Sequence, residues 1–114
     1  MVIRTLLLIF SLSVSAETSL YESDSDSASI NINQEDEHYR VSGNAAWVSP
    51  VSDSVHDGEF KGITQFDSVG VAFVKDRYCE LVLYKTDSVL YVNQLDDADC
   101  GGMNVSFSGR YIEK

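Results

Sequence analysis

From Tyr39 onward, short runs rich in aromatic and β-branched residues alternate with clusters of Gly, Asp, Ser and Asn. Such runs are typical of strands, because branched and aromatic side chains pack well on a pleated surface. The pattern predicts an all-β fold over residues 38–114, a small antiparallel β-sandwich or a barrel-like domain. The expected strands cover residues 39–48, 59–66, 69–74, 78–84, 89–94 and 104–112.

Residues 70–84 allow two interpretations. Their apolar positions also fit a helical stripe, so a helix is an alternative here. Enrichment in valine and aromatic residues favours two strands joined at residues 75–77. The next turn, at residues 85–88, has the spacing of a four-residue hairpin loop, which would pair Tyr84 with Val89 and place Cys79 opposite Gln94.

Two segments are expected to be irregular. Residues 17–37 contain a serine–aspartate run that cannot bury enough apolar area to offset chain entropy, so we predict an acidic flexible arm. Within it, Ile30 and Ile32 alternate with polar residues and could add one edge strand. Residues 49–58 hold the only proline and end in Asp57-Gly58, a pair typical of a turn.

The first sixteen residues have the composition of a secretory signal. Arg4 precedes a mostly apolar run at residues 5–14, and small residues up to Ala16 form an A-x-A-like cleavage site. The alternative, a membrane anchor, needs roughly 20 apolar residues, about twice the length of this run. We therefore predict a signal peptide at 1–16, a mature protein that is periplasmic or secreted, and no membrane span after processing.

Cys79 and Cys100 are the only cysteines. An even pair in an exported chain is typical of one disulfide, the alternatives being two free thiols or an incomplete metal pair. His38 and His56 are the only histidines, and neither has zinc-ligand spacing to a cysteine. We predict a Cys79–Cys100 disulfide and no metal site.

The net charge and the absence of catalytic motifs exclude several classes of function. The chain carries 18 acidic and 8 basic residues, a net charge of −10, which excludes a nucleic-acid binder held by phosphate contacts. Loss of Arg4 with the signal peptide would make the charge −11. The serines are numerous, but the two histidines lie in the acidic arm and in the proline-containing loop, where we expect them to be exposed rather than paired with a serine. No glycine-rich phosphate loop is present. We predict a protein that is not an enzyme and needs no cofactor.

Two features are candidate contacts for a partner. Asp96, Asp97 and Asp99 crowd the residues before Cys100, either as a solvated turn or as part of an electronegative face for a cationic protein. Trp47 is the only tryptophan, either a core anchor or an exposed recognition residue.

The C-terminal stretch has the form C-G-x-x-x-V-x-F-x-G-x-Y over residues 100–111. It resembles the tail of small exported bacterial proteins, largely uncharacterised, and of modules in the lysozyme-inhibitor-like group. The resemblance implies an exported binding protein whose basic partner is a cationic cell-wall hydrolase such as lysozyme. The alternatives are a periplasmic immunity or adaptor protein that neutralises a specific toxin, and a structural envelope protein.

Overall fold

The computed structural model describes residues 17–114, and the signal peptide predicted at 1–16 lies outside the described residues. The described chain contains eight antiparallel strands and no helix. The strands are β1 (Thr18–Ser23), β2 (Ala28–Glu35), β3 (His38–Val48), β4 (Val55–Thr64), β5 (Val71–Asp76), β6 (Cys79–Lys85), β7 (Val89–Gln94) and β8 (Gly109–Glu113). The prediction of an all-β, barrel-like domain is confirmed.

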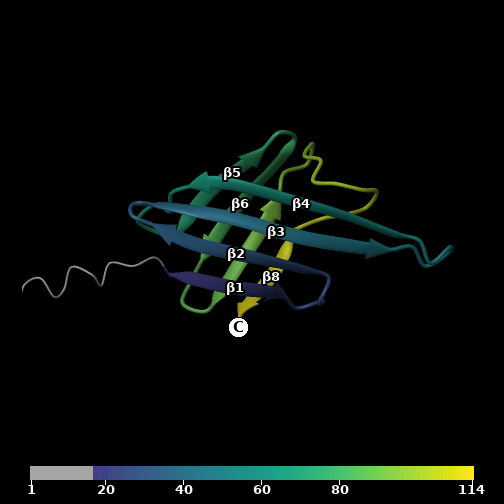
Figure 1. The fold of residues 1–114 in the computed structure, drawn as a ribbon, viewed down its shortest axis with the longest axis horizontal. Helices are drawn as coiled ribbons and strands as arrows, with labels where there is room; N and C mark the ends of the chain where they lie inside the picture. Colours follow the sequence, from purple (N-terminus) through teal and green to yellow (C-terminus); the bar gives the residue numbers. More distant parts are fainter. Residues whose placement is uncertain (1–16) are drawn as a thin grey trace, which may run out of the picture.

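The strands form one sheet that closes almost completely into a barrel (Figure 1). Successive strands pair along the chain except β4 and β5, which are the two edges of the sheet. β8 returns to pair with β1, and the sheet order is β4-β3-β2-β1-β8-β7-β6-β5. The remaining seam, between β4 and β5, is bridged by side chains. The backbone N–H of Lys61 donates to a carboxylate oxygen of Asp76 (2.9 Å), and the hydroxyl of Thr64 donates to the carbonyl of Phe73 (2.7 Å). Closure leaves little exposed sheet edge.

The core fills the barrel because alternate residues of each strand face inward. Strands from both halves contribute fully buried side chains, including Tyr21, Ile30, Val41, Val74, Leu81, Leu83, Leu90 and Tyr111. Gly43 makes room for a large ring, since a Cβ there would lie 2.6 Å from a ring carbon of Phe60. The interior is therefore packed with side chains over most of its length.

The connection between β7 and β8, residues 95–108, folds back over the core. Phe107 is fully buried, and its ring meets that of Phe60 edge-on with centroids 4.8 Å apart. The Phe107 N–H donates to Oε1 of Gln94 (2.9 Å), and the Tyr111 hydroxyl donates to the Phe107 carbonyl (2.7 Å). The strand predicted at 104–112 is therefore wrong in its first half, because side chains rather than a neighbouring strand satisfy this backbone.

The flexible arm predicted at 17–37 is also wrong, since these residues form β1 and β2 inside the sheet. Apolar residues alternate with polar ones in this segment, so its composition is polar overall. Tyr21, Ile30 and Ile32 nevertheless face the core and are buried. The serine–aspartate run is the hairpin turn between the two strands. There the Ser23 hydroxyl accepts from the N–H groups of Ser27 (3.1 Å) and Ala28 (3.0 Å).

Three local predictions have mixed outcomes. Residues 71–85 are two strands, so the helix alternative is wrong. The hairpin between β6 and β7 exists, but Tyr84 pairs with Tyr91 rather than Val89, because a shorter turn closes with the Thr86 N–H donating to the Val89 carbonyl (2.9 Å). Asp57-Gly58 is not a turn; it lies within β4, and the β3–β4 turn occupies residues 49–54.

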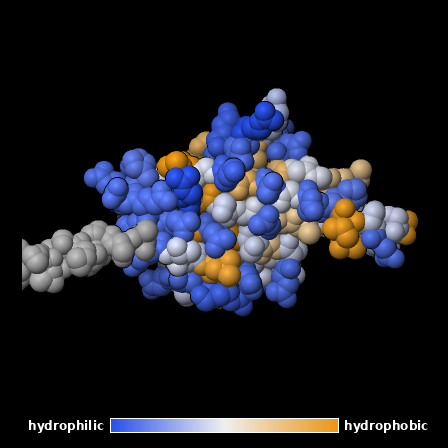
Figure 2. All heavy atoms as spheres, in the orientation of Figure 1, coloured by the Kyte–Doolittle hydropathy of each residue, from blue (hydrophilic) through white to orange (hydrophobic). Residues whose placement is uncertain are grey.

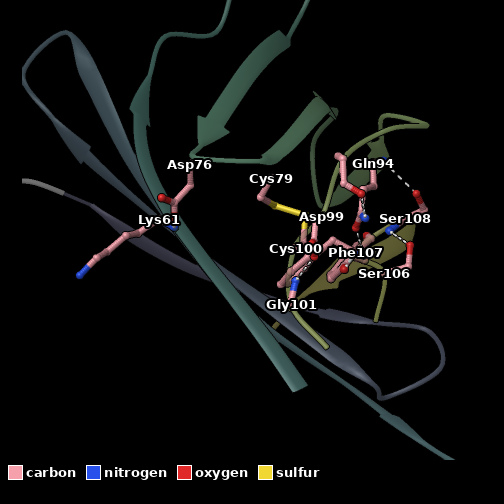
Figure 3. The surroundings of a disulfide bond; sticks show 12 residues. Lys61, Asp76, Cys79, Gln94, Asp99, Cys100, Gly101, Ser106, Phe107 and Ser108 are labelled. Carbon is pink, nitrogen blue, oxygen red and sulfur yellow. Dashed lines mark hydrogen bonds between the residues drawn. A yellow bond between two sulfur atoms is a disulfide. The ribbon is translucent and has the colours of Figure 1, made fainter. Parts of the chain in front are cut away.

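The predicted Cys79–Cys100 disulfide is confirmed (Figure 3). The two Cα atoms lie 4.5 Å apart and both residues are buried. The bond ties the start of β6 to the 95–108 connection. It therefore holds this long connection against the barrel.

Candidate functional site

An open cavity of about 1120 Å³ lies at one end of the barrel. This end, which we call the cavity end, holds the segments 24–27, 49–54, 77–78 and 95–108, each of which connects two strands. The cavity is lined on one side by β2, β3 and β4, and on the other by the β5–β6 turn and residues 99–101. Turns brought together on a rigid barrel are a common position for binding sites.

The hollow results from small residues in one row of the sheet. Ala28 pairs with Ala45, and Ala45 pairs with Gly58, so three neighbouring strands present almost no side-chain volume at this level. Asn44 and Glu59 form the next pair along β3 and β4, and strand alternation directs their side chains to the outer surface. The wall of the cavity formed by these strands is therefore largely backbone and small side chains.

The disulfide-linked segment packs directly on this row. A Cβ at Gly58 would overlap the carbonyl oxygen of Cys100, and one at Gly102 would lie 2.9 Å from Cβ of His56. The Gly102 N–H donates to the carbonyl of Asp57 (3.0 Å), and Gly101 has a φ of 147° that favours glycine. The glycine at 58 is required by this close approach, and the segment forms a fixed wall of the cavity.

The cavity end is strongly acidic. Its four connecting segments carry six acidic residues and one basic residue, Arg77. The acidic residues are Asp24, Asp26, Asp53, Asp96, Asp97 and Asp99. One of them, Asp24, forms an ion pair with Arg110 at 2.9 Å. The remaining carboxylates present a concentrated negative charge to an approaching partner.

The sequence-predicted contact residues occupy different places. Asp99 lines the cavity, where its carboxylate accepts from the Gly101 N–H (3.1 Å). Asp96 and Asp97 are exposed in the turn that follows β7. Trp47 is half-buried against the core, with its ring 5.6 Å from that of His56, an arrangement that fits the core-anchor alternative. Partner binding by these four residues stays a prediction.

The barrel interior is uncharged at neutral pH. Burial raises the pKa of the Tyr111 phenol well above its usual range, and burial together with the nearby Glu113 carboxylate raises that of Tyr21. The Tyr21 hydroxyl is buried with no hydrogen-bond partner among residues 17–114. Charge available for recognition therefore lies on the rim and the outer surface rather than inside the barrel.

The two histidines lie far apart. His38 begins β3, whereas His56 pairs with Trp47, nine residues further along that strand and thus roughly 30 Å away. Across residues 17–114, no group of three or more His, Cys, Asp or Glu side chains is placed to hold a metal ion. The arrangement therefore provides an open cavity with negatively charged side chains around it, which could bind a positively charged group.

Sequence reasoning missed the cavity itself. Ala28, Ala45 and Gly58 are far apart in sequence and become one row only through strand pairing. Residues 28–33 alternate between apolar and polar, a pattern that indicates the strand β2. The serines and aspartates on its N-terminal side led instead to the prediction of a flexible arm.

Within residues 17–114 there is no helix with the length and hydrophobicity to cross a membrane. No family model, curated protein or solved structure matches this chain. The resemblance to exported proteins and to the lysozyme-inhibitor-like group therefore stays a prediction.

Proposed function

We propose that the protein is an exported, non-enzymatic binding protein that captures a cationic protein through the cavity end of its barrel. The observation that carries the proposal is the charge of this end, six acidic residues against one basic residue in its connecting segments. Two of them, Asp26 and Asp99, line the open cavity of about 1120 Å³. A convex basic surface, or a basic side chain that projects from one, is complementary to such a rim in both shape and charge.

Several contacts fix the segments at the cavity end, so a partner could bind there without a rearrangement of the backbone. The disulfide and the close contact of Gly58 with Cys100 hold the 95–101 segment in place. The β1–β2 turn is fixed by the Ser23 hydroxyl, and Asp26 adopts a φ of 61° within it. A rigid binding surface loses little conformational entropy when the complex forms.

Electrostatic steering gives the complex a measurable signature. Clustered charge raises association rates strongly at low ionic strength, and salt screens the effect because the Debye length is about 8 Å at 0.15 M. Lysozyme, a cationic cell-wall hydrolase, is the partner that the C-terminal resemblance implies. Binding that blocks its substrate cleft would inhibit it.

The test is a titration of the purified protein against lysozyme, with both binding and residual hydrolytic activity measured at 20 and 200 mM salt. We expect binding and inhibition at low salt that weaken at the higher concentration. The variant with Asp96→Asn and Asp97→Asn removes two exposed charges from the cavity end, and we expect it to slow association several-fold.

The matched control removes two exposed charges from the opposite end, with Asp36→Asn and Glu37→Gln in the β2–β3 turn. Both double variants change the net charge equally, so only a local effect separates them. Equal loss in the two variants would contradict a site at the cavity end. Absence of binding by the parent protein at micromolar excess in low salt would exclude lysozyme as the partner.

A further inference from the structure

The outer surface of the barrel differs between its two halves. On β2, the outward residues are Ser29, Asn31 and Asn33, and the side that carries β1–β4 shows mostly hydrophilic residues with separate hydrophobic patches (Figure 2). On β5, β6 and β7 the outward residues include three aromatic side chains that remain strongly exposed: Phe73 (53%), Tyr84 (44%) and Tyr91 (44%). We call these three residues, with Val71 and Val82 between them, the aromatic face.

Strand pairing arranges the aromatic face in two adjacent rows. Val71 pairs with Tyr84, Tyr84 with Tyr91, and Tyr91 with Arg110, which gives one row across β5, β6, β7 and β8. A second row runs from Phe73 to Val82 and on to Asn93. The Tyr84 and Tyr91 rings are nearly parallel, at 22° with centroids 6.0 Å apart. The face is therefore a continuous surface of aromatic and branched side chains.

The first row ends at Arg110 on β8, which forms an ion pair. Arg110 forms an ion pair with Asp24 at 2.9 Å, and interactions with the Asp24 carboxylate and then the Tyr91 hydroxyl raise the pKa of its guanidinium. The Arg110–Asp24 ion pair thus connects the end of this row to the β1–β2 turn. Tyr91 lies between the stacked ring of Tyr84 and its register partner Arg110 on β8.

The aromatic face is small for the interface of a stable homodimer. Fully buried aromatic side chains cover about 150–250 Å² each, so the exposed fractions of the three rings sum to roughly 200–350 Å². A stable protein interface buries about 800 Å² on each partner. An apolar patch near 300 Å² is instead of the size that often carries a function on a monomer.

The charges around the aromatic face point to an uncharged ligand. Lys75 pairs with Glu80 on the neighbouring strand (3.3 Å), and Arg110 is already paired with Asp24, so the rim is locally balanced. A polyanion would be repelled by the net charge of −10, and a cationic protein would find stronger attraction at the cavity end. The ligand that fits is flat, neutral and rich in hydroxyl groups.

We propose that the aromatic face binds a neutral glycan chain, with sugar rings packed on Tyr84, Tyr91 and Phe73. The C–H groups on the face of a pyranose ring carry a small positive charge, which suits the negative π-face of an aromatic ring. The amide of Asn93 and the Glu80–Lys75 pair lie on the same outer surface and offer hydrogen-bond partners for sugar hydroxyls. This site is separate from the cavity end and does not depend on the function proposed for it.

The experiment is calorimetric titration of the protein with two soluble neutral probes, cellohexaose and chitohexaose. We expect the parent protein to bind at least one of them, and Tyr84→Ala and Tyr91→Ala each to weaken binding about tenfold or more. Val48→Ala is the control, because Val48 is an exposed apolar residue (56%) at the end of β3 and lies neither on the aromatic face nor in the segments of the cavity end. It is expected to bind like the parent.

Thermal unfolding of each variant checks that the fold is intact, since loss of a half-exposed ring changes stability little. No binding of either probe at millimolar concentration would overturn the proposal, and so would binding that Tyr84→Ala and Tyr91→Ala leave unchanged. A parent protein that sediments as a dimer, and that Tyr84→Ala converts to a monomer, would assign the face to a second copy instead. That result too would overturn the glycan proposal.

Discussion

Replacement of Phe107 by alanine tests the packing of the long β7–β8 connection against the core. Phe107 lies outside every strand, yet its side chain is fully buried and its ring packs edge-on against Phe60 at 4.8 Å. Its N–H donates a hydrogen bond to the Gln94 side chain, and its carbonyl accepts one from the Tyr111 hydroxyl. Truncation would open a void where the connection covers the core, and these backbone contacts limit the collapse that could refill it.

Buried Phe→Ala changes cost about 3–5 kcal/mol, and the rigid surroundings place Phe107 within this range. A domain of this size loses at least about 4 °C of Tm per kcal/mol, so the melting temperature should fall by about 12 °C or more. Urea titration, followed by the fluorescence of the single residue Trp47, measures the free energy of unfolding directly.

Met103→Ala is the control, because Met103 belongs to the same connection but is 65% exposed. It should change the free energy of unfolding by no more than about 0.5 kcal/mol. If Phe107→Ala also stays within about 1 kcal/mol of the parent, the connection does not pack on the core as described, and the reasoning about the cavity wall is wrong.

Other predictions concern the disulfide, the glycine row and the buried phenol. Joint Cys79→Ser and Cys100→Ser replacement should cost about 3 kcal/mol in urea unfolding, since the bridge closes a loop of sequence separation 21; an unchanged midpoint would contradict this. Gly58→Ala should cost about 1–3 kcal/mol by the same assay, because its Cβ would overlap the Cys100 carbonyl. For Tyr111, the raised pKa means that above pH 10 the unfolded state releases a proton that the folded state keeps, so stability should fall as pH rises. Tyr111→Phe should flatten this alkaline decline and cost about 1–3 kcal/mol at neutral pH; an equal decline in both proteins would count against it.

Much of the second half of the barrel follows from the sequence. Residues 89–94 form a strand with the predicted bounds, and the two runs before it are strands displaced by one or two residues. Here apolar and β-branched residues are dense, and short turns separate the strands clearly. The disulfide also follows, because only one pairing of Cys79 and Cys100 is possible.

The first half shows where composition misleads. In β2, Ile30 and Ile32 alternate with polar residues. Only one face of the strand is apolar, so the average composition of the segment is polar. Once closed into a barrel, that single face is sufficient, because its side chains meet those of the opposite strands. Composition measured over residues 17–37 cannot detect this, whereas the period-two pattern does.

The cavity and the aromatic face depend on pairing over long distances. The Ala28–Ala45–Gly58 row and the Tyr84–Tyr91–Arg110 row exist only once the register of several strands is fixed. In the β6–β7 hairpin, a difference of two residues in turn length was enough to alter every partner. Neither site was therefore accessible to reasoning from local sequence.

Nuclear magnetic resonance mapping of backbone amides during titration with lysozyme at low salt shows which end of the barrel binds. We expect the largest shift changes at Asp26, Arg77 and residues 99–101, which line the cavity, and at the adjoining residues 96–98, and we expect salt to reverse them. Changes confined to the opposite end, at residues 36–37 and 86–88, or no changes at all, would contradict capture of lysozyme by the cavity end.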